Sequence, residues 1–86
     1  MYKLILHKKA SKYYQDLDDK TARRINKAIE NIIDNPLKGA HIKQLKGELE
    51  GKHRYDVGAL RIVYSVDIEK EIIYIEAIGP RGDVYK

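Results

Sequence analysis

The most regular pattern of apolar and polar positions in this chain lies in its second quarter. Apolar residues recur there every three or four positions, a period that places them along one face of an α-helix. They are Ala22, Ile25, Ala28, Ile29, Ile32 and Ile33. Asp18 or Asp19 can cap the start of this helix, and Asn35-Pro36 ends it because a residue before proline disfavours helical backbone angles. The pattern predicts an amphipathic helix that buries this stripe and leaves Arg23 and Arg24 in solvent.

Two shorter elements precede this helix. Tyr2 to Leu6 is apolar around Lys3 and predicts a strand. Lys8 to Leu17 predicts a helix, because its apolar and aromatic residues again follow the helical period. These residues are Ala10, Tyr13, Tyr14 and Leu17. The connection between the two helices is short, so we expect an antiparallel helical hairpin with its apolar faces on a sheet.

From His41 onward, the spacing of apolar positions shortens towards two, the period of a β-strand. Four segments follow this pattern: Ile42 to Leu45, Lys52 to Val57, Leu60 to Val66 and Glu71 to Ile78. The order of elements predicts an α+β fold, in which an N-terminal strand and a helical hairpin pack on a small, mostly antiparallel four-stranded sheet. We expect residues 1–86 to form a single domain.

Alternation along the second of these strands separates two faces of the sheet. Lys52, Arg54 and Asp56 share one face. The opposite face consists of His53, Tyr55 and Val57. Three tyrosines of the predicted strands are expected in the core: Tyr55, Tyr64 and Tyr74. The helices cover one face of the sheet, so the cationic side chains are expected on the free face.

Composition is typical of a small, folded and highly charged domain. The chain is 43% hydrophobic and 35% charged, and 17 Lys and Arg against 13 Asp and Glu give a net charge of +4. This moderate excess favours polyanionic partners. Cysteine is absent, which excludes disulfides and thiol chemistry and is compatible with a cytoplasmic location. No apolar run approaches the ~20 residues of a membrane-spanning helix, and no signal-peptide pattern is present.

Arginines on the predicted strands and in the segment after them point to nucleic acid. Arg54, Arg61 and Arg81 lie there among lysines and tyrosines. The planar fork of a guanidinium suits phosphate oxygens, and arginines on alternating strand positions can project from one sheet face. A solvated charged surface is the simpler alternative, because long charged side chains are usually exposed.

The same region contains an ordered series of short motifs. They are Leu45-Lys46-Gly47, then Arg54, then Gly58 with Arg61-Ile62-Val63-Tyr64, and finally Ile78-Gly79 with Arg81 and Val84-Tyr85. In this order and spacing the series resembles the RelE/ParE superfamily of toxins from toxin–antitoxin pairs. The resemblance follows the whole chain in element order, with its specific residues between Leu45 and Tyr85. It implies a cognate antitoxin as partner.

The two branches of this superfamily share a fold and differ in function. The RelE branch cuts messenger RNA in the ribosomal A site, whereas the ParE branch inhibits DNA gyrase without cleaving anything itself. Arg54, Arg61, Arg81 and Tyr85 favour a RelE-like, metal-independent endoribonuclease that acts with the ribosome on mRNA. A gyrase inhibitor is the alternative, and an inactive member of a regulatory complex is a third reading.

The resemblance also implies roles in RNA cleavage, in which a 2′-hydroxyl attacks the neighbouring phosphate. Arg61 and Arg81 would clamp that phosphate and stabilise its developing charge, which is often the largest catalytic effect. Tyr85 would stack on a base or assist proton transfer.

Three further cations are candidates for binding the RNA. By the same resemblance, Lys52 and Arg54 would hold the RNA backbone, and Arg54 could also stabilise charge. Lys46 lies in a predicted glycine-containing loop. We expect its main role to be in the geometry of the turn, and contact with RNA to be its secondary role.

The chain departs from the family pattern at several positions. Asp56 stands where RelE-type nucleases often have a basic residue, Pro80 replaces a histidine before Arg81, and Leu60 replaces a tyrosine. Asp56 could act as general base, as could His53 if its strand turns it outward. An ion pair between Asp56 and the neighbouring arginine of its strand is the simpler reading of that carboxylate. The three histidines lack metal-ligand spacing, so we expect neither a metal nor a cofactor.

Overall fold

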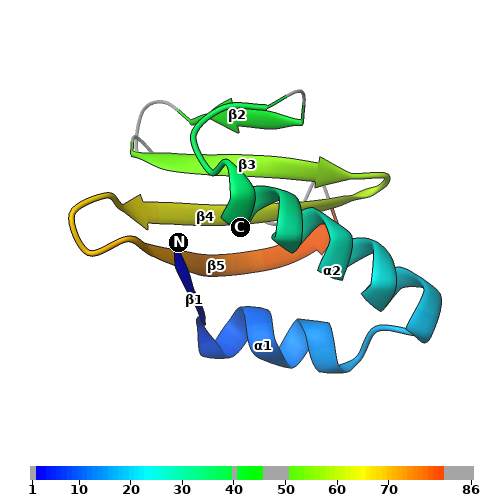
Figure 1. Cartoon of the computed structure of the whole chain (residues 1–86). Helices are drawn as coiled ribbons and strands as arrows, with labels where there is room; N and C mark the ends of the chain where they lie inside the picture. The colour runs from blue at the N-terminus through cyan, green and yellow to red at the C-terminus, as the bar shows by residue number, and fades with distance from the viewer. Residues whose placement is uncertain (1, 40, 46–50, 81–86) are drawn as a thin grey trace.

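The computed structural model describes residues 2–39, 41–45 and 51–80, which form two helices and a five-stranded sheet (Figure 1). The elements in chain order are β1 (Lys3–Leu6), α1 (Lys8–Gln15), α2 (Asp19–Asp34), β2 (Ile42–Gln44), β3 (Lys52–Val57), β4 (Leu60–Asp67) and β5 (Ile72–Pro80). The predicted α+β class is confirmed. The N-terminal strand, which we expected beside a four-stranded sheet, is the fifth strand of that sheet.

The strands lie in the order β1-β5-β4-β3-β2. The first strand pairs in parallel with the last, and the other neighbours are antiparallel, so the sheet is mostly antiparallel as predicted. Both helices lie on the same face of this sheet (Figure 1). This arrangement leaves the opposite face without a helix among the described residues.

The helix boundaries follow from local hydrogen bonds. The Asp18 carboxylate accepts from the Thr21 backbone N–H at 3.3 Å, which caps α2 as the sequence predicts. Helix α1 ends at Gln15, two residues before the predicted end at Leu17. The backbone N–H groups of Asp16 and Leu17 bond three residues back, so the chain tightens there into the turn between the helices.

The core lies between the two helices and the sheet. Its largest fully buried side chains are Ile25, Ile32, Ile62, Tyr64, Ile73 and Ile75. The Tyr64 hydroxyl donates to the Pro36 carbonyl oxygen at 2.6 Å, so this buried polar group is satisfied. Tyr55 is also buried, as predicted.

The prediction that Tyr74 belongs to the core is wrong. Its neighbours Ile73 and Ile75 point toward the helices, so alternation along β5 sends Tyr74 to the opposite face. The ring is half-buried there, with its centroid 6.0 Å from that of His7. No helix in the described part of the chain has the length and apolar character needed to cross a membrane.

Candidate functional site

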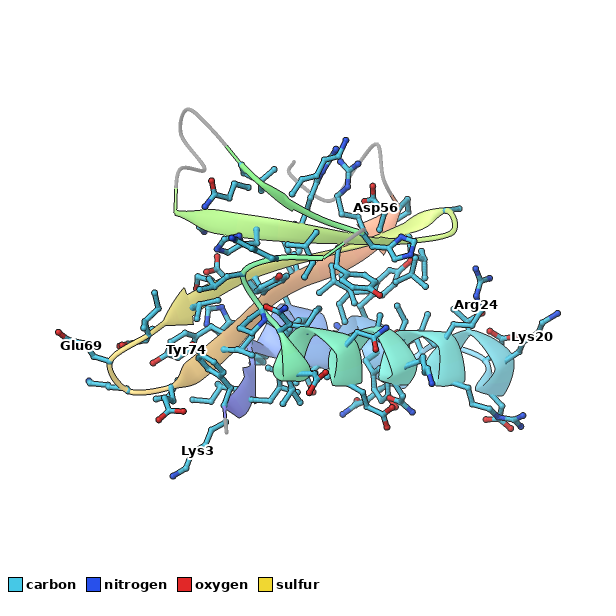
Figure 2. All side chains as sticks on the ribbon, turned by 45° about the horizontal axis from the view of Figure 1, so that its top comes forward. Lys3, Lys20, Arg24, Asp56, Glu69 and Tyr74 are labelled. Atoms are coloured by element: carbon cyan, nitrogen blue, oxygen red, sulfur yellow. The ribbon has the colours of Figure 1, made fainter. Side chains whose placement is uncertain are left out.

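The candidate site is the sheet face that the helices leave free. Lys52, Arg54 and Asp56 alternate along β3 onto this face, as the sequence predicts. Their partners on β4 are Ser65, Val63 and Arg61, respectively. In Figure 2, Asp56 lies on the side of the sheet away from the helices, whereas Arg24 extends from α2. Three of the predicted cations are therefore brought together on neighbouring strands.

Arg61 is held by a carboxylate. Its Nε donates to Asp56 Oδ1 at 2.7 Å, and its Nη2 lies 3.5 Å from Asp56 Oδ2. The Arg61 side chain is 8% exposed and that of Asp56 27%, so the pair is shielded from most of the solvent. The predicted partner of Asp56 was wrong, because hairpin pairing places Arg61, and not Arg54, directly opposite it.

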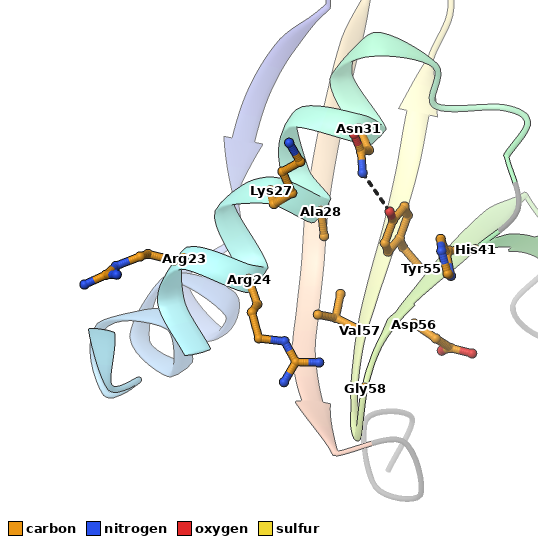
Figure 3. A pocket seen from close by; sticks show the side chains of 10 residues that line it. All are labelled: Arg23, Arg24, Lys27, Ala28, Asn31, His41, Tyr55, Asp56, Val57 and Gly58. Atoms are coloured by element: carbon orange, nitrogen blue, oxygen red, sulfur yellow. Dashed lines mark hydrogen bonds between the residues drawn. The ribbon is translucent and has the colours of Figure 1, made fainter. Parts of the chain in front are cut away.

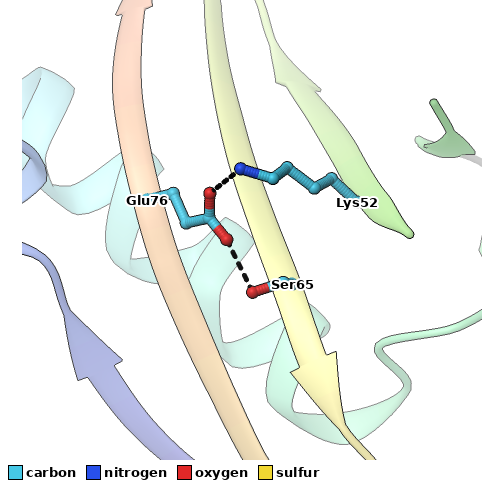
Figure 4. A network of polar contacts seen from close by, with 3 residues as sticks. All are labelled: Lys52, Ser65 and Glu76. Atoms are coloured by element: carbon cyan, nitrogen blue, oxygen red, sulfur yellow. Dashed lines mark hydrogen bonds and ion pairs between the residues drawn. The ribbon is translucent and has the colours of Figure 1, made fainter. Parts of the chain in front are cut away.

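Lys52 is also paired, with a carboxylate that the sequence analysis missed. Its Nζ forms an ion pair with Glu76 Oε1, and the Ser65 hydroxyl donates to Glu76 Oε2 at 2.6 Å (Figure 4). The register of β4 and β5 shifts between Val63 and Tyr64, which inserts Glu76 as an extra residue on β5. Alternation from Tyr74 would have placed Glu76 on the free face.

Glu76 is held in its ionised form. Burial acts to raise its pKa, but the hydrogen bonds from Lys52 and Ser65 and the charge of Lys52 lower it below its ordinary value of 4.5. Two of the predicted RNA-binding cations, Lys52 and Arg61, are thus matched by carboxylates on the same face. The net positive charge of this face is smaller than the sequence suggested.

Arg54 differs from these two cations. Its Nε is buried and has no hydrogen-bond partner, and no ion pair joins it to a described acidic residue. Lys43 of β2 lies opposite Arg54 in the sheet register and is exposed. Among the described residues, these two neighbouring cations add positive charge to the free face along β2 and β3. Lys43 was not singled out from the sequence, although the alternation of β2 and β3 could have placed it there.

The family model described as the ParE toxin of the type II toxin–antitoxin system parDE matches residues 4–85. The chain belongs to this family of toxins. The predicted membership of the RelE/ParE superfamily is confirmed, and the protein is a toxin of a toxin–antitoxin pair. A comparison with curated protein sequences gives no match.

Solved structures support the fold of the toxin. The archaeal RelE–RelB complex from Pyrococcus horikoshii OT3 matches with a TM-score of 0.80 at 26% identity, over 96% of this chain and 98% of that chain. The YoeB–YefM complex from Staphylococcus aureus matches with a TM-score of 0.73 at 26% identity, over 91% of this chain and 94% of that chain. The YoeB/ParE toxin from Agrobacterium tumefaciens has a TM-score of 0.82 at 23% identity, over 92% and 98% of the two chains, and shows likeness of fold.

His53 of the toxin does not reach the free face. Its side chain points to the helix side, where the residue is 6% exposed and its ring stacks on Tyr64 with centroids 5.4 Å apart. Burial lowers the pKa of this imidazole. The condition under which His53 could serve as a general base, an outward orientation, is therefore not met. Asp56 stays as the candidate base among the described residues that the sequence indicated.

The remaining predicted site residues of the toxin, Lys46, Arg81 and Tyr85, lie outside the described residues. Pro80 and Leu60, which depart from the family pattern, are partners at the end of the β4–β5 ladder, next to Arg61. Across residues 2–39, 41–45 and 51–80, no three His, Asp or Glu side chains gather in a metal-binding arrangement.

Proposed function

We propose that this toxin is a metal-independent endoribonuclease that cuts mRNA in the ribosomal A site and is neutralised by a cognate antitoxin. The observation that carries the proposal is the gathering of Lys52, Arg54 and Arg61 on one sheet face that no described helix covers. A rigid sheet positions such groups more firmly than a loop does. The solved RelE–RelB and YoeB–YefM structures, which are complexes, support an antitoxin as partner.

The proposed reaction is a transesterification. The 2′-oxygen of the RNA forms a bond to the adjacent phosphorus while the bond from phosphorus to the 5′-oxygen breaks. One proton leaves the 2′-hydroxyl for a general base, and another is delivered to the departing 5′-oxygen. Arg61 would stabilise the additional negative charge on the phosphate oxygens, with Arg81 beside it by resemblance.

Asp56 would be the base in this scheme. Its Oδ1 accepts from Arg61 Nε at 2.7 Å, and its Oδ2 lies 3.5 Å from Arg61 Nη2. Arg61 would orient Asp56 and place its positive charge beside the phosphate. Tyr85 would stack on a base or assist proton transfer.

Gyrase inhibition is the second candidate. The description of the matching family, ParE, favours it, and so do the Asp56–Arg61 and Lys52–Glu76 pairs, which neutralise two of the cations needed for RNA. In this case the toxin binds its target and catalyses nothing. A substitution of Arg81 or Tyr85 would then leave toxicity largely intact.

Incubation with ribosomes programmed with a defined mRNA separates these functions. We expect new 5′ ends confined to the A-site codon, and their loss in Arg81→Ala, with circular dichroism to verify folding. Lys70→Glu, in the exposed turn between β4 and β5, is the matched control and should cleave normally. An intact message together with inhibition of gyrase supercoiling would support the second candidate. If the toxin neither cleaves the message nor inhibits gyrase, a role in a regulatory complex is the reading that stands.

A further inference from the structure

A second candidate site lies on the helix side of the sheet and meets the proposed RNA face at Asp56. It is a groove of about 420 Å³ between α2 and the end of β3 (Figure 3). Cationic side chains of α2 line one wall, and apolar side chains form the floor. The wall contains Arg23, Arg24 and Lys27, and the floor contains Ala28, Tyr55 and Val57.

The charges of this wall are not balanced within the described chain. Arg23, Arg24 and Lys27 are all exposed, and none forms an ion pair with a described acidic residue. Asp56 is the acidic residue that borders the groove, and its carboxylate is bonded to Arg61. Arg23 and Arg24 are exposed to solvent, as the sequence predicts, and the structure places them beside a groove.

Specific contacts fix the shape of the groove. Asn31 Nδ2 donates to the Tyr55 hydroxyl at 3.0 Å, which joins α2 to β3 across the floor (Figure 3). At the other end, the Arg24 guanidinium lies against the turn after β3. A Cβ added at Gly58 would be 2.6 Å from Arg24 Nη2, so the close approach depends on glycine at this position.

The chemistry of the groove favours a protein segment over RNA. Single-stranded RNA is generally gripped by exposed aromatic rings that stack on its bases. Here the Tyr55 ring is buried with its hydroxyl bonded to Asn31, so His41 is the one exposed aromatic residue in the described lining, and its ring centroid lies 5.5 Å from that of Tyr55. Apolar floor residues beside three cations instead complement a peptide that carries an apolar side chain flanked by carboxylates.

We propose that this groove binds an acidic, partly apolar segment of the partner protein, with its carboxylates on Arg23, Arg24 and Lys27. The inference rests on the proposed antitoxin pairing for the identity of that partner. It places one contact of the partner on the helix side of the sheet, next to Asp56.

The test uses the full chain and a labelled peptide that alternates Glu and Leu. We expect saturable binding that weakens with salt, and amide chemical-shift changes at Ala28, Asn31 and Val57 rather than on the free sheet face. The double variant Arg23→Glu, Lys27→Glu should bind about tenfold or more weakly, because two attractive pairs become repulsive. Lys70→Glu removes a distant exposed cation and should bind like the unaltered chain. Thermal unfolding verifies that the variants are folded.

Cleavage of programmed mRNA by the same variants separates the two proposals. If the peptide binds in the groove but neither the unaltered toxin nor any variant cleaves mRNA, the nuclease proposal is overturned and the groove assignment stands. Cleavage with no peptide binding, or with shifts on the free sheet face instead, would overturn the groove assignment. So would a double variant that binds peptide normally but no longer binds a uridine oligonucleotide, because the cations would then belong to the RNA surface.

Discussion

Asp56 and Arg61 lie directly opposite each other on β3 and β4, and a 2.7 Å hydrogen bond joins the carboxylate of one to the guanidinium of the other. The turn between these strands fixes this register, so the pair is part of the hairpin itself. The same arginine is the residue that the family resemblance assigns to the scissile phosphate. Arg61 therefore has both a structural role in the hairpin and a proposed role in cleavage.

This pair is expected to contribute to stability. Asp56→Ala removes the carboxylate beside the buried Arg61 side chain, and we expect the free energy of unfolding to fall by about 2 kcal/mol, the range of a lost hydrogen bond to a charged group. Asp56→Asn retains an oxygen acceptor and should cost less. Urea unfolding followed by circular dichroism measures both, with the exposed Asp34→Ala as control. Equal stability of all three variants and the unaltered chain would show that solvent screens the pair.

Glu76 is expected to restrain Lys52 from binding RNA. In Glu76→Gln the lysine loses its ionic partner and becomes available to a phosphate. We expect tighter binding of single-stranded RNA and a dependence of log K on log salt that is steeper by about 0.7, the value for one further phosphate contact. Ser65→Ala removes only the hydroxyl donor and is the control. Fluorescence anisotropy at several salt concentrations gives the slopes, and an unchanged slope in Glu76→Gln contradicts the idea.

His53 is expected to make stability depend on pH. Its pKa in the folded chain lies below its ordinary value of 6.5, so just below pH 6.5 the unfolded chain binds more protons at this residue. Stability should be complete above that pH and decrease as the pH falls towards the folded pKa. His53→Phe preserves a ring on Tyr64 and removes the titration, so this decrease should disappear.

The carboxyl of Glu76 adds a second, more acidic window of the same sign. Its lowered pKa stabilises the fold above 4.5, and this contribution is lost as the pH falls below that value. His53→Phe should leave this lower window in place. Urea midpoints measured across both windows test the assignment. A loss of stability near pH 6 that persists in His53→Phe would assign it to another group.

Gly58 is expected to tolerate alanine poorly, for two separable reasons. Its φ is +57°, which strains a residue with a Cβ, and that Cβ would lie 2.6 Å from Arg24 Nη2, so that the exposed guanidinium must shift. We expect Gly58→Ala to lower the free energy of unfolding by about 1 kcal/mol or more. In an Arg24→Ala background the cost should be smaller, because only the backbone strain remains. Equal costs in both backgrounds would mean that the arginine moves away freely.

The periodicity of apolar residues in the sequence is sufficient to predict the helices and strands and, for most of them, which face is buried. The stripe of α2 and the alternation of β3 predict which side chains meet the core, and His53 was correctly placed on the same face as Tyr55. Tyr74 was misplaced because its neighbours are all apolar, so alternation there gives no sign of which face is buried. Only the pairing of β5 with β1 and β4 decides it.

The ionic pairs of the candidate site could not be predicted from the sequence, for a different reason. Arg54 is nearer to Asp56 along the chain, but the register of the hairpin selects Arg61. Alternation from Tyr74 puts Glu76 on the free face, but only the strand order, with β3 and β5 on either side of β4, brings it to Lys52. The groove beside Arg24 depends in turn on where β3 ends relative to α2. Each of these contacts arises from elements that are separate in the chain.

The parallel pairing of β1 with β5 affects how the protein folds during translation. Lys3 is joined to Ile72 and Leu6 to Ile75, so the earliest strand finds its neighbour only when the latest one has been made. Contacts between such distant segments form slowly, since a long loop must close first. During translation the helices therefore emerge before β5 is available to join β1 to β4 in the sheet. A nascent toxin should be harmless until its last strand has left the ribosome, a delay in which a partner already present can reach it.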